Sequence, residues 1–363
     1  MMFLRRIGLS ALVLTASASF FGCEDDLPKA TLIDHMRVLG ARTEVVGDEA
    51  RSTPRPGEKA RLTWAMAYPD LDEDDGELSS LFLACTAPSR YTGNPVCQEL
   101  VDAATGRGRP IGGLFRQTPD GCDVRPNSVQ TVAGIRLYCV TGTPELELTI
   151  DSSIKTDRLI QGIICRNGLP AIDPESPVGA TCWPNAGVDE DDVESIPVYG
   201  TVAVAAEEDD ENQNPNLDML DLTLRKGSLS GQRNTWNPTP ADQLPGLIED
   251  CSTVATDVVL SSEGHSEVIE FDYPRQRSED EDLVFSTYAT FGELSRRFTV
   301  LESDSARDTD EPDLTWELSE EERADLFDTP KLVRFYFTVL DGRGGFDVTT
   351  RELCIRRLDD SSR

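Results

Sequence analysis

Hydrophobic and polar residues alternate with a period of two along much of this chain. The segment 59–68 is the clearest early example, because every second residue from Ala60 to Tyr68 is apolar and a Pro-Gly turn at 54–57 precedes it. A period of two puts one face of a β-strand in a core and the other face in solvent. Similar patterns predict further strands at Leu81–Cys85, Ile135–Val140, Leu146–Ile150, Leu159–Cys165 and Val198–Val204.

The pattern returns in a C-terminal block that runs from about Asp250 to Arg357. Ser319 and Glu322 have the spacing of a capping box, which predicts one or two helical turns that end before Pro330. Strands without crossover helices favour antiparallel pairing, so the chain is predicted to be all-β, with tandem antiparallel β-sandwich domains. The strands predicted in this block lie at 269–273, 283–291, 333–339 and 346–355, with a turn at 341–345.

An acidic stretch rich in Asn and Pro, 207–216 (EEDDENQNPN), divides the chain. Its few apolar residues cannot offset the entropy of ordering, so we expect a linker or an exposed loop, followed by a short strand at Leu220–Leu224. The predicted organisation is a signal peptide over 1–22, a lipidated tether over 23–30, an N-terminal disulfide-containing β domain over 31–206, a connector over 207–246, a C-terminal β-sandwich over 247–358 and a tail over 359–363.

The first 23 residues have the pattern of an export signal. Arg5 and Arg6 precede an apolar run, Ile7–Phe21, which is shorter than the roughly 20 residues of a membrane-spanning helix. The end of this segment, Phe-Phe-Gly-Cys23, resembles the lipobox of bacterial lipoproteins, in which the cysteine sulfur is lipidated. Cys23 is therefore the predicted lipid attachment site and membrane anchor. The alternatives are an ordinary secretory signal and twin-arginine export, which Gly8 and the short n-region do not favour.

The cysteine content indicates an oxidising compartment. The chain has nine cysteines and two histidines, and no pair has CxxC spacing, so no metal or other cofactor is predicted. Without Cys23 eight cysteines remain, an even number that favours disulfides. The two pairings that we favour are Cys165 with Cys182 and Cys251 with Cys354. The full set of disulfide candidates is Cys85, Cys97, Cys122, Cys139, Cys165, Cys182, Cys251 and Cys354.

The net charge and the candidate catalytic residues argue against nucleic-acid binding and against catalysis. The formal net charge of −32 excludes the basic patch that nucleic-acid binding requires. His35, beside Asp34 in a predicted strand, is expected to be a partly exposed structural histidine, and His265 lies in a predicted turn. The string Gly227–Gly231 (GSLSG) fails the nucleophile-elbow pattern because leucine stands at its centre. No catalytic residue is predicted, and the chain is not expected to be an enzyme.

Three acidic clusters are the abundant candidate metal ligands: Asp70–Glu77, Glu207–Glu211, and the group Asp308, Asp310 and Asp313. The first approximates a Ca²⁺ loop, but its glycine falls one place late and no glutamate closes it. In a chain this acidic, solvated loops are the favoured interpretation, and specific Ca²⁺ sites are the alternative.

The stretch 335–355 (FYFTVLDGRGGFDVTTRELCI) resembles the last hairpin of bacterial immunoglobulin-like and PKD-like extracellular modules. The mature chain as a whole is similar to uncharacterised lipoproteins of myxobacteria and their relatives. The shared motifs are a first strand like 32–46 (LIDHMRVLGARTEVV), the turn Pro56–Glu58, the connector Asn214–Asn216 and the turn Asp341–Gly345. The resemblance implies immunoglobulin-like architecture and no particular activity.

Two functions follow from these observations. The leading hypothesis is a non-enzymatic lipoprotein of the cell envelope that is structural, adhesive, or binds an envelope protein or glycan. The alternative is a polysaccharide-directed envelope hydrolase with paired carboxylates. Trp183 and Trp236, in Pro- and Asn-rich contexts, are expected to cap a core or to stack on sugars. Glu24 and Asp25 follow the anchor, where acids affect retention in the inner membrane of some bacteria. This sorting rule varies between lineages, and the outer membrane is preferred over the inner membrane or the cell surface.

Overall fold

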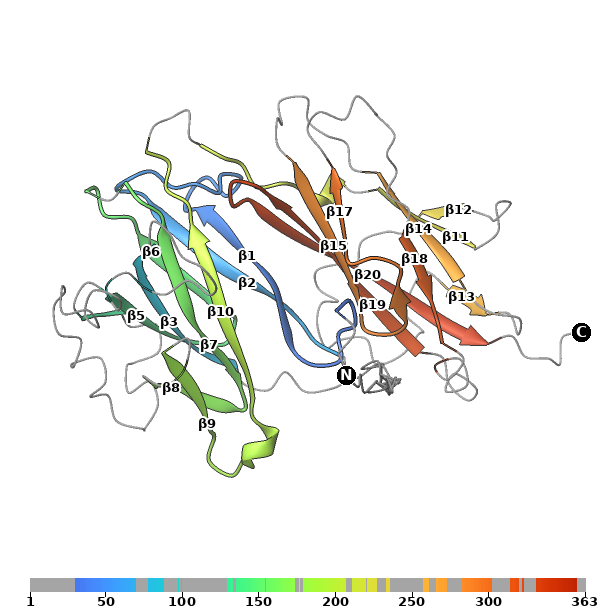
Figure 1. The fold of residues 1–363 in the computed structure, drawn as a ribbon, viewed down its shortest axis with the longest axis horizontal. Coiled ribbons are helices and arrows are strands. Elements are labelled where there is room, and N and C mark those ends of the chain that lie inside the picture. The colour runs from blue at the N-terminus through green and yellow to red at the C-terminus, as the bar shows by residue number, and fades with distance from the viewer. Residues whose placement is uncertain are drawn as a thin grey trace, which may run out of the picture. The chain divides into compact units, whose positions relative to one another are not determined.

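The computed structural model describes residues 30–69, 78–87, 97, 99, 129–132, 135–153, 155–173, 176, 179–206, 211–219, 221–226, 233–235, 257–260, 266–272, 282–301, 314–319, 322 and 331–357. The chain separates into two compact units, Met1–Ala30 and Thr31–Arg363. The regular structure of the second unit is mainly β-strand, as the alternating pattern predicts (Figure 1). No helix in the described part of the chain is long and apolar enough to cross a membrane.

The first sandwich packs a three-stranded sheet against a five-stranded sheet. The smaller sheet has the order β1 (Arg37–Val45), β2 (Lys59–Ala67), β6 (Glu145–Thr149). The larger sheet has the order β10 (Glu194–Val202), β7 (Arg158–Arg166), β3 (Leu78–Thr86), β5 (Ile135–Thr141), β4 (Val129–Val132). All these strand pairs are antiparallel. Strands β1, β2 and β6 thus take the places of immunoglobulin strands A, B and E, and β3, β7 and β10 those of C, F and G.

The core of the first sandwich is built from the apolar positions of the alternating pattern. Trp64 of β2 stacks on Phe82 of β3 with ring centroids 4.2 Å apart, and Leu62 and Leu146 are buried in the same cluster. Burial of each such side chain contributes about 1.5–3 kcal/mol. Strand β7 is buried along its whole length. Both faces of its sheet are therefore covered.

The outer cover of that sheet is a hairpin of β8 (Gly168–Ile172) and β9 (Ala180–Pro184). Ala180 of the hairpin belongs to a second apolar cluster with Leu81 and Ile163 of the sheet. Two short 3-10 helices complete the described elements, η2 (Glu190–Asp192) after the hairpin and η4 (Leu217–Met219) before the second sandwich.

The second sandwich shares the central strand order of the first, but its edge strands differ. One sheet has the order β12 (Arg233–Thr235), β11 (Asp221–Lys226), β14 (Ser266–Asp272), β18 (Leu314–Glu317), β16 (Glu293–Leu294). The other has the order β13 (Asp257–Leu260), β20 (Phe346–Arg357), β19 (Lys331–Asp341), β15 (Leu283–Ala289), β17 (Phe298–Leu301). Only β13 and β20 pair in parallel among these strands. Strands β14 and β18 correspond to B and E, and β15, β19 and β20 to C, F and G, so the predicted tandem immunoglobulin-like sandwiches are confirmed.

A fully buried tryptophan lies at the centre of the second core. Trp316 meets Phe335 edge to face with centroids 5.3 Å apart, and its Nε1 donates to the carbonyl of Phe291 at 2.8 Å. Close by in sequence, the Ser319 N–H donates to the Glu322 carboxylate at 2.7 Å, and the Glu322 N–H donates to the Ser319 hydroxyl at 3.1 Å. The predicted capping box is therefore present.

Three sequence-based expectations need correction. The short strand expected within the connector is β11, which pairs with β14 and belongs to the second sandwich. The described connector residues are not an exposed linker, since Asn212 and Leu217 are buried. His35 lies in a bend before β1 rather than in a strand. In each case contacts with distant segments decide the outcome, and local composition does not report them.

Candidate binding surface

The β8–β9 hairpin carries the most prominent exposed tryptophan of the described residues. Trp183 is 50% exposed and lies opposite Leu169, which is 43% exposed. Side chains alternate between faces along a strand, so the neighbouring Cys182 points the other way, toward the cluster that covers the sheet. Trp183 and Leu169 therefore form an apolar pair that faces solvent on a hairpin whose opposite face is fastened to a core.

Covalent and polar contacts hold this hairpin in place. A disulfide joins Cys182 to Cys165 of β7, and the Ser79 hydroxyl of β3 donates to the carbonyl of Gly168. Gly168 suits this place because a Cβ there would collide with the Trp183 carbonyl and with the Val193 side chain. The tryptophan is thus presented by a constrained backbone, which lowers the entropy cost of binding.

The surroundings of Trp183 are polar and acidic. Asn167, in the left-handed conformation at φ 61°, opens the hairpin and donates from its amide to the carbonyl of Asp192 at 3.3 Å. Helix η2 contacts β9 and adds three exposed carboxylates, Glu190, Asp191 and Asp192. An aromatic face bordered by hydrogen-bond acceptors suits a ligand with a flat apolar face and many hydroxyl groups, and it disfavours an anion.

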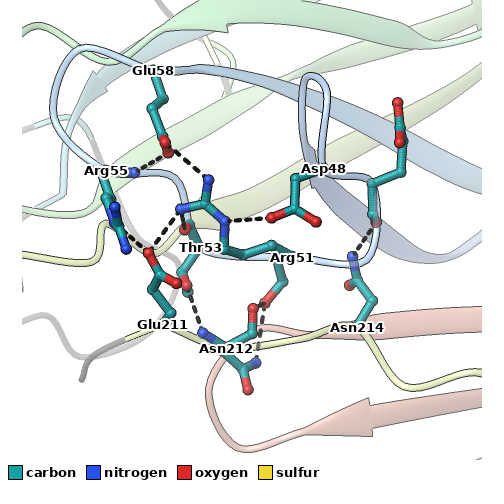
Figure 2. A network of polar contacts seen from close by, with 10 residues as sticks. Asp48, Arg51, Thr53, Arg55, Glu58, Glu211, Asn212 and Asn214 are labelled. Atoms are coloured by element: carbon teal, nitrogen blue, oxygen red, sulfur yellow. Dashed lines mark hydrogen bonds and ion pairs between the residues drawn. The ribbon is translucent and has the colours of Figure 1, made fainter. Parts of the chain in front are cut away.

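A second conspicuous cluster lies where the connector meets the first sandwich. Figure 2 shows that Arg51 is its centre: its guanidinium donates to Asp48 at 3.2 Å, to Glu58 at 2.9 Å and to Glu211 at 3.0 Å. Glu211 also pairs with Arg55. The hydrogen bond from Arg51 to Glu58 raises the pKa of Arg51 against the opposing effect of burial. Burial alone would raise the pKa of Glu58, but hydrogen bonds from Arg51 and from the Arg55 N–H lower its pKa overall.

Two further connector residues, Asn212 and Asn214, join the first sandwich to the second. Asn212 donates from its amide to the Asp341 carboxylate at 2.8 Å, and its own N–H donates to the Thr53 hydroxyl at 2.7 Å. Asn214 accepts from the N–H of Phe346 at 3.1 Å and donates to the carbonyl of Thr43 at 2.7 Å. Both asparagines thus contact both sandwiches. The Pro-Gly-Glu, Asn-Pro-Asn and Asp-Gly-Arg-Gly-Gly motifs of the sequence all meet in this polar junction.

Asp347 adds a further contact to the junction. Its carboxylate accepts from Arg42 of β1 at 2.9 Å and from the N–H of Leu217 at 2.7 Å. Burial raises the pKa of Asp347, and these two partners offset the effect only in part. An open pocket of about 520 Å³ lies nearby, and both of its charged side chains already bind the chain: Arg343 donates to the carbonyl of Glu211, and Asp157 accepts from the N–H of Val204.

The disulfide candidates lie as follows. The predicted Cys165–Cys182 pair is formed, and so is Cys85–Cys97, for which no pairing is predicted. Cys139 is also disulfide-bonded. Cys354 lies in β20, while the predicted lipid site Cys23 and the candidates Cys122 and Cys251 are outside the described residues, so the Cys251–Cys354 pairing stays a prediction.

Of the other singled-out residues, those that the structure describes form no group of catalytic or metal-binding side chains. His35 is 55% exposed at its side chain and contacts Asp34 at 2.5 Å through Nδ1. Within the described ranges, no group of three or more His, Cys, Asp or Glu side chains could hold a metal ion. His265, Trp236, the string 227–231 and the clusters 70–77 and 308–313 lie outside the described residues, as does 207–210 of the third acidic cluster.

Buried carboxylates bear on the hydrolase alternative. Among the described residues the buried acids are Asp341 and Glu352. Asp341 accepts from Asn212 and from the turn that follows it, and Glu352 accepts two hydrogen bonds from Arg334. Each therefore has a structural partner in the fold. Trp183, at 50% exposure, does not cap a core, which was the favoured interpretation of its Pro- and Asn-rich context, and it is exposed as the alternative interpretation requires.

No protein-family model matches this chain. No curated protein matches it. Among solved structures it is similar to the D0-D1 domain of Intimin, with a TM-score of 0.19 and 7% sequence identity over 88% of this chain and 98% of that chain. The assignment of the fold therefore rests on the strand order of the two sandwiches.

Proposed function

We propose that this chain is a non-enzymatic lipoprotein of the bacterial cell envelope, of the myxobacterial type that its sequence resembles. In this proposal a lipid on Cys23 anchors it to the outer membrane, and its two immunoglobulin-like sandwiches bind a glycan of the envelope. The binding surface is the Trp183–Leu169 pair of the β8–β9 hairpin.

The exposure and constraint of Trp183 carry this proposal. A half-exposed tryptophan on a backbone that a disulfide fastens has the properties of a preorganised anchor for a ligand. The apolar pair accommodates the flat face of a sugar ring, and Glu190, Asp191 and Asp192 provide acceptors for its hydroxyl groups. Their negative charge favours neutral glycans over anionic ones.

The polar junction supports a structural part of the same role. Asn212 and Asn214 hydrogen-bond to both sandwiches, so a force on one module passes to the other through the connector. A protein that holds a polymer to a membrane must transmit force between its anchor and its binding surface, and this connector provides such a path.

The glycan proposal is tested by isothermal titration of the purified protein with neutral and with uronic-acid oligosaccharides. The Trp183→Ala variant should weaken neutral-glycan binding by about tenfold or more, equivalent to about 1.4 kcal/mol. Val46→Ala is the matched control, because Val46 is an exposed apolar residue at 43% on the same sandwich. Equal binding by wild type and Trp183→Ala would contradict the proposal.

The anchor is tested separately by metabolic labelling with palmitate, followed by membrane fractionation. Wild type should incorporate label and sediment with the outer membrane, and Cys23→Ala should lose both properties. Label retained by Cys23→Ala would refute lipidation at this site, whatever the outcome of the glycan experiment.

A further inference from the structure

Strand β17 lies at the edge of a five-stranded sheet of the second sandwich, where β15 is its one paired strand among the described residues. The Thr287 N–H of β15 donates to the carbonyl of Arg297 at 3.2 Å. Hydrogen-bonded and non-hydrogen-bonded pairs alternate along an antiparallel ladder, so the peptide groups of Thr299 also face β15. Those of Phe298 and Val300 therefore point away from the sheet, with two N–H and two C=O groups at the edge.

The side chains at this edge are apolar and exposed. Phe298 is 58% exposed, Val300 is 43% and Leu340 of β19 is 46%. The register places Val300 opposite Val284 of β15, and Val284 opposite Leu340. One apolar row thus crosses three strands on the outer face of the sheet. Contiguous exposed apolar surface of this kind marks interaction sites on soluble domains.

The opposite edge of the equivalent sheet in the first sandwich, formed by β10 beside β7, is protected. Its edge strand β10 contains Pro197, which has no N–H to donate, and begins with Glu194. Proline and charged side chains are the usual means by which proteins prevent edge-to-edge pairing. Strand β17 has neither within its four residues. The β17 edge lacks both means of protection and is therefore open to pairing with another strand.

We propose that β17 pairs antiparallel with β17 of a second copy of this chain, about a two-fold axis at Thr299. In this register Phe298 of one copy lies opposite Val300 of the other, and each such pair exchanges two hydrogen bonds through the outward-pointing peptide groups. The outward-pointing N–H and C=O groups of Phe298 and Val300 in both copies then have hydrogen-bond partners. The two five-stranded sheets join into one continuous sheet, with Phe298 and Val300 of both copies in contact on its outer face.

The pattern of the edge favours a second copy over an unlike strand. Every antiparallel edge strand can meet the geometric requirement of a two-fold axis, but here the axis at Thr299 places the exposed Phe298 of each strand beside the exposed Val300 of the other, so that each copy covers apolar surface of its partner. The positions of the charged side chains next to the strand also favour antiparallel pairing. Arg296 and Arg297 are exposed just before the strand, so the arginine pairs of the two copies lie at opposite ends of the interface and do not repel each other.

The first test is the mass of the purified protein by sedimentation velocity over a range of concentrations. Wild type should shift from monomer to dimer as concentration rises, and Val300→Lys should raise the dissociation constant at least about tenfold. Val46→Lys is the matched control, because Val46 is equally exposed at 43% on the other sandwich. A monomer at all concentrations, or a dimer that Val300→Lys leaves intact, would overturn the proposal.

The second test examines the register. Two Thr299 residues would form the central non-hydrogen-bonded pair, whose Cα atoms lie about 4.5 Å apart, within the range of a disulfide. Mild oxidation of Thr299→Cys should therefore give a covalent dimer. Thr201→Cys, exposed on the protected β10 edge, should not. Cross-linking of both variants alike, or of neither, would refute the β17 pairing.

The dependence of the monomer–dimer equilibrium on salt concentration provides an independent test. Each copy carries a formal net charge of −32, so two copies repel each other at low ionic strength. Screening at about 0.15 M salt should strengthen the dimer relative to about 0.01 M. Dimerisation does not depend on the proposed glycan binding: Trp183→Ala should leave the dissociation constant of the dimer unchanged, and a loss of dimer in that variant would contradict the β17 interface.

Discussion

The amide of Asn212 donates to the carboxylate of Asp341 at 2.8 Å, and so joins the connector to the turn of the last hairpin. The other oxygen of Asp341 accepts from the N–H groups of Arg343 and Gly345 at 2.8 and 2.7 Å. One buried carboxylate therefore both closes a turn of the second sandwich and binds a residue that the first sandwich holds. The two roles make this side chain an acceptor that the connector and the last hairpin share.

Replacing Asp341 should destabilise the turn and the junction together. Asp341→Ala removes three hydrogen bonds to a charged acceptor, and bonds of that kind contribute about 1.5–3 kcal/mol each before relaxation. We expect a loss of at least about 3 kcal/mol in the free energy of unfolding of the second sandwich, measured by urea denaturation. Asn212→Ala removes only the connector contact and should cost less. A smaller effect of Asp341→Ala than of Asn212→Ala would contradict this division of roles.

The junction shows how far the sequence alone leads. Alternation predicted the strands on both sides of it, and the Asp-Gly-Arg-Gly-Gly turn was predicted where it occurs. The connector was predicted to be exposed, because its composition is acidic and polar. Its buried state depends on partners such as Asp341, 129 positions away from Asn212 in the sequence. Composition reports the cost of burying polar groups, but it does not report which distant groups satisfy them.

Two carboxylates of the junction should affect stability with opposite dependence on pH. The pKa of Glu58 is lowered in the fold from its ordinary value of 4.5, since hydrogen bonds from Arg51 and the Arg55 N–H outweigh burial. Glu58 therefore stabilises the fold above pH 4.5, and this contribution is lost as the pH falls through the lowered pKa. Glu58→Gln should destabilise by up to about 1 kcal/mol at pH 7, with a smaller difference from wild type at acidic pH.

Asp347 should behave in the reverse way. Burial raises its pKa above the ordinary value of 3.8, so the ionised form is disfavoured in the fold. Its contribution is most favourable below pH 3.8 and declines as the pH rises through the raised pKa. Relative to Asp347→Asn, wild type should therefore gain stability on acidification, as measured by urea unfolding at a series of pH values. Glu190→Gln, at an exposed site, controls for the loss of one carboxylate.

The binding surface was less predictable than the strands. The Cys165–Cys182 pairing was predicted from sequence proximity and is present, yet the β8–β9 hairpin that it fastens was not predicted. Residues 168–172 include Pro170, and the hairpin residues do not alternate cleanly, because one face covers a sheet and the other carries both Ala171 and Leu169. Trp183 is exposed because the opposite face of the hairpin covers the sheet, and no local sequence pattern indicates this arrangement.

Gly292 should tolerate no side chain. Its φ is +78°, and a Cβ there would collide with Nε1 of the fully buried Trp316 and with the backbone carbonyl of Glu317. Gly292→Ala should therefore cost about 2–4 kcal/mol, from backbone strain and overpacking together. Gly187→Ala is the matched control: its φ is +90° with open space around the Cβ position, so strain alone should cost about 1–2 kcal/mol. Equal costs in thermal denaturation would contradict the packing argument.

Arg334 and Glu352 form a buried ion pair between β19 and β20. Their side chains are 1% and 4% exposed, and Nε and Nη2 of Arg334 both donate to one oxygen of Glu352, at 2.9 and 2.5 Å. Removal of one partner leaves an uncompensated buried charge, so Glu352→Ala should cost about 3–5 kcal/mol in the free energy of unfolding. Arg334→Met should cost a similar amount for the same reason.

The double variant separates the value of the pair from the penalty of breaking it. In Arg334→Met with Glu352→Leu no charge is buried and the volume is nearly kept, so its stability should be close to that of wild type or above it. A double-mutant cycle by urea denaturation would then give a coupling energy of several kcal/mol, although the pair itself adds little net stability. Additive losses in the double variant would mean that neighbouring groups compensate each charge separately, and the two residues would not act as a pair.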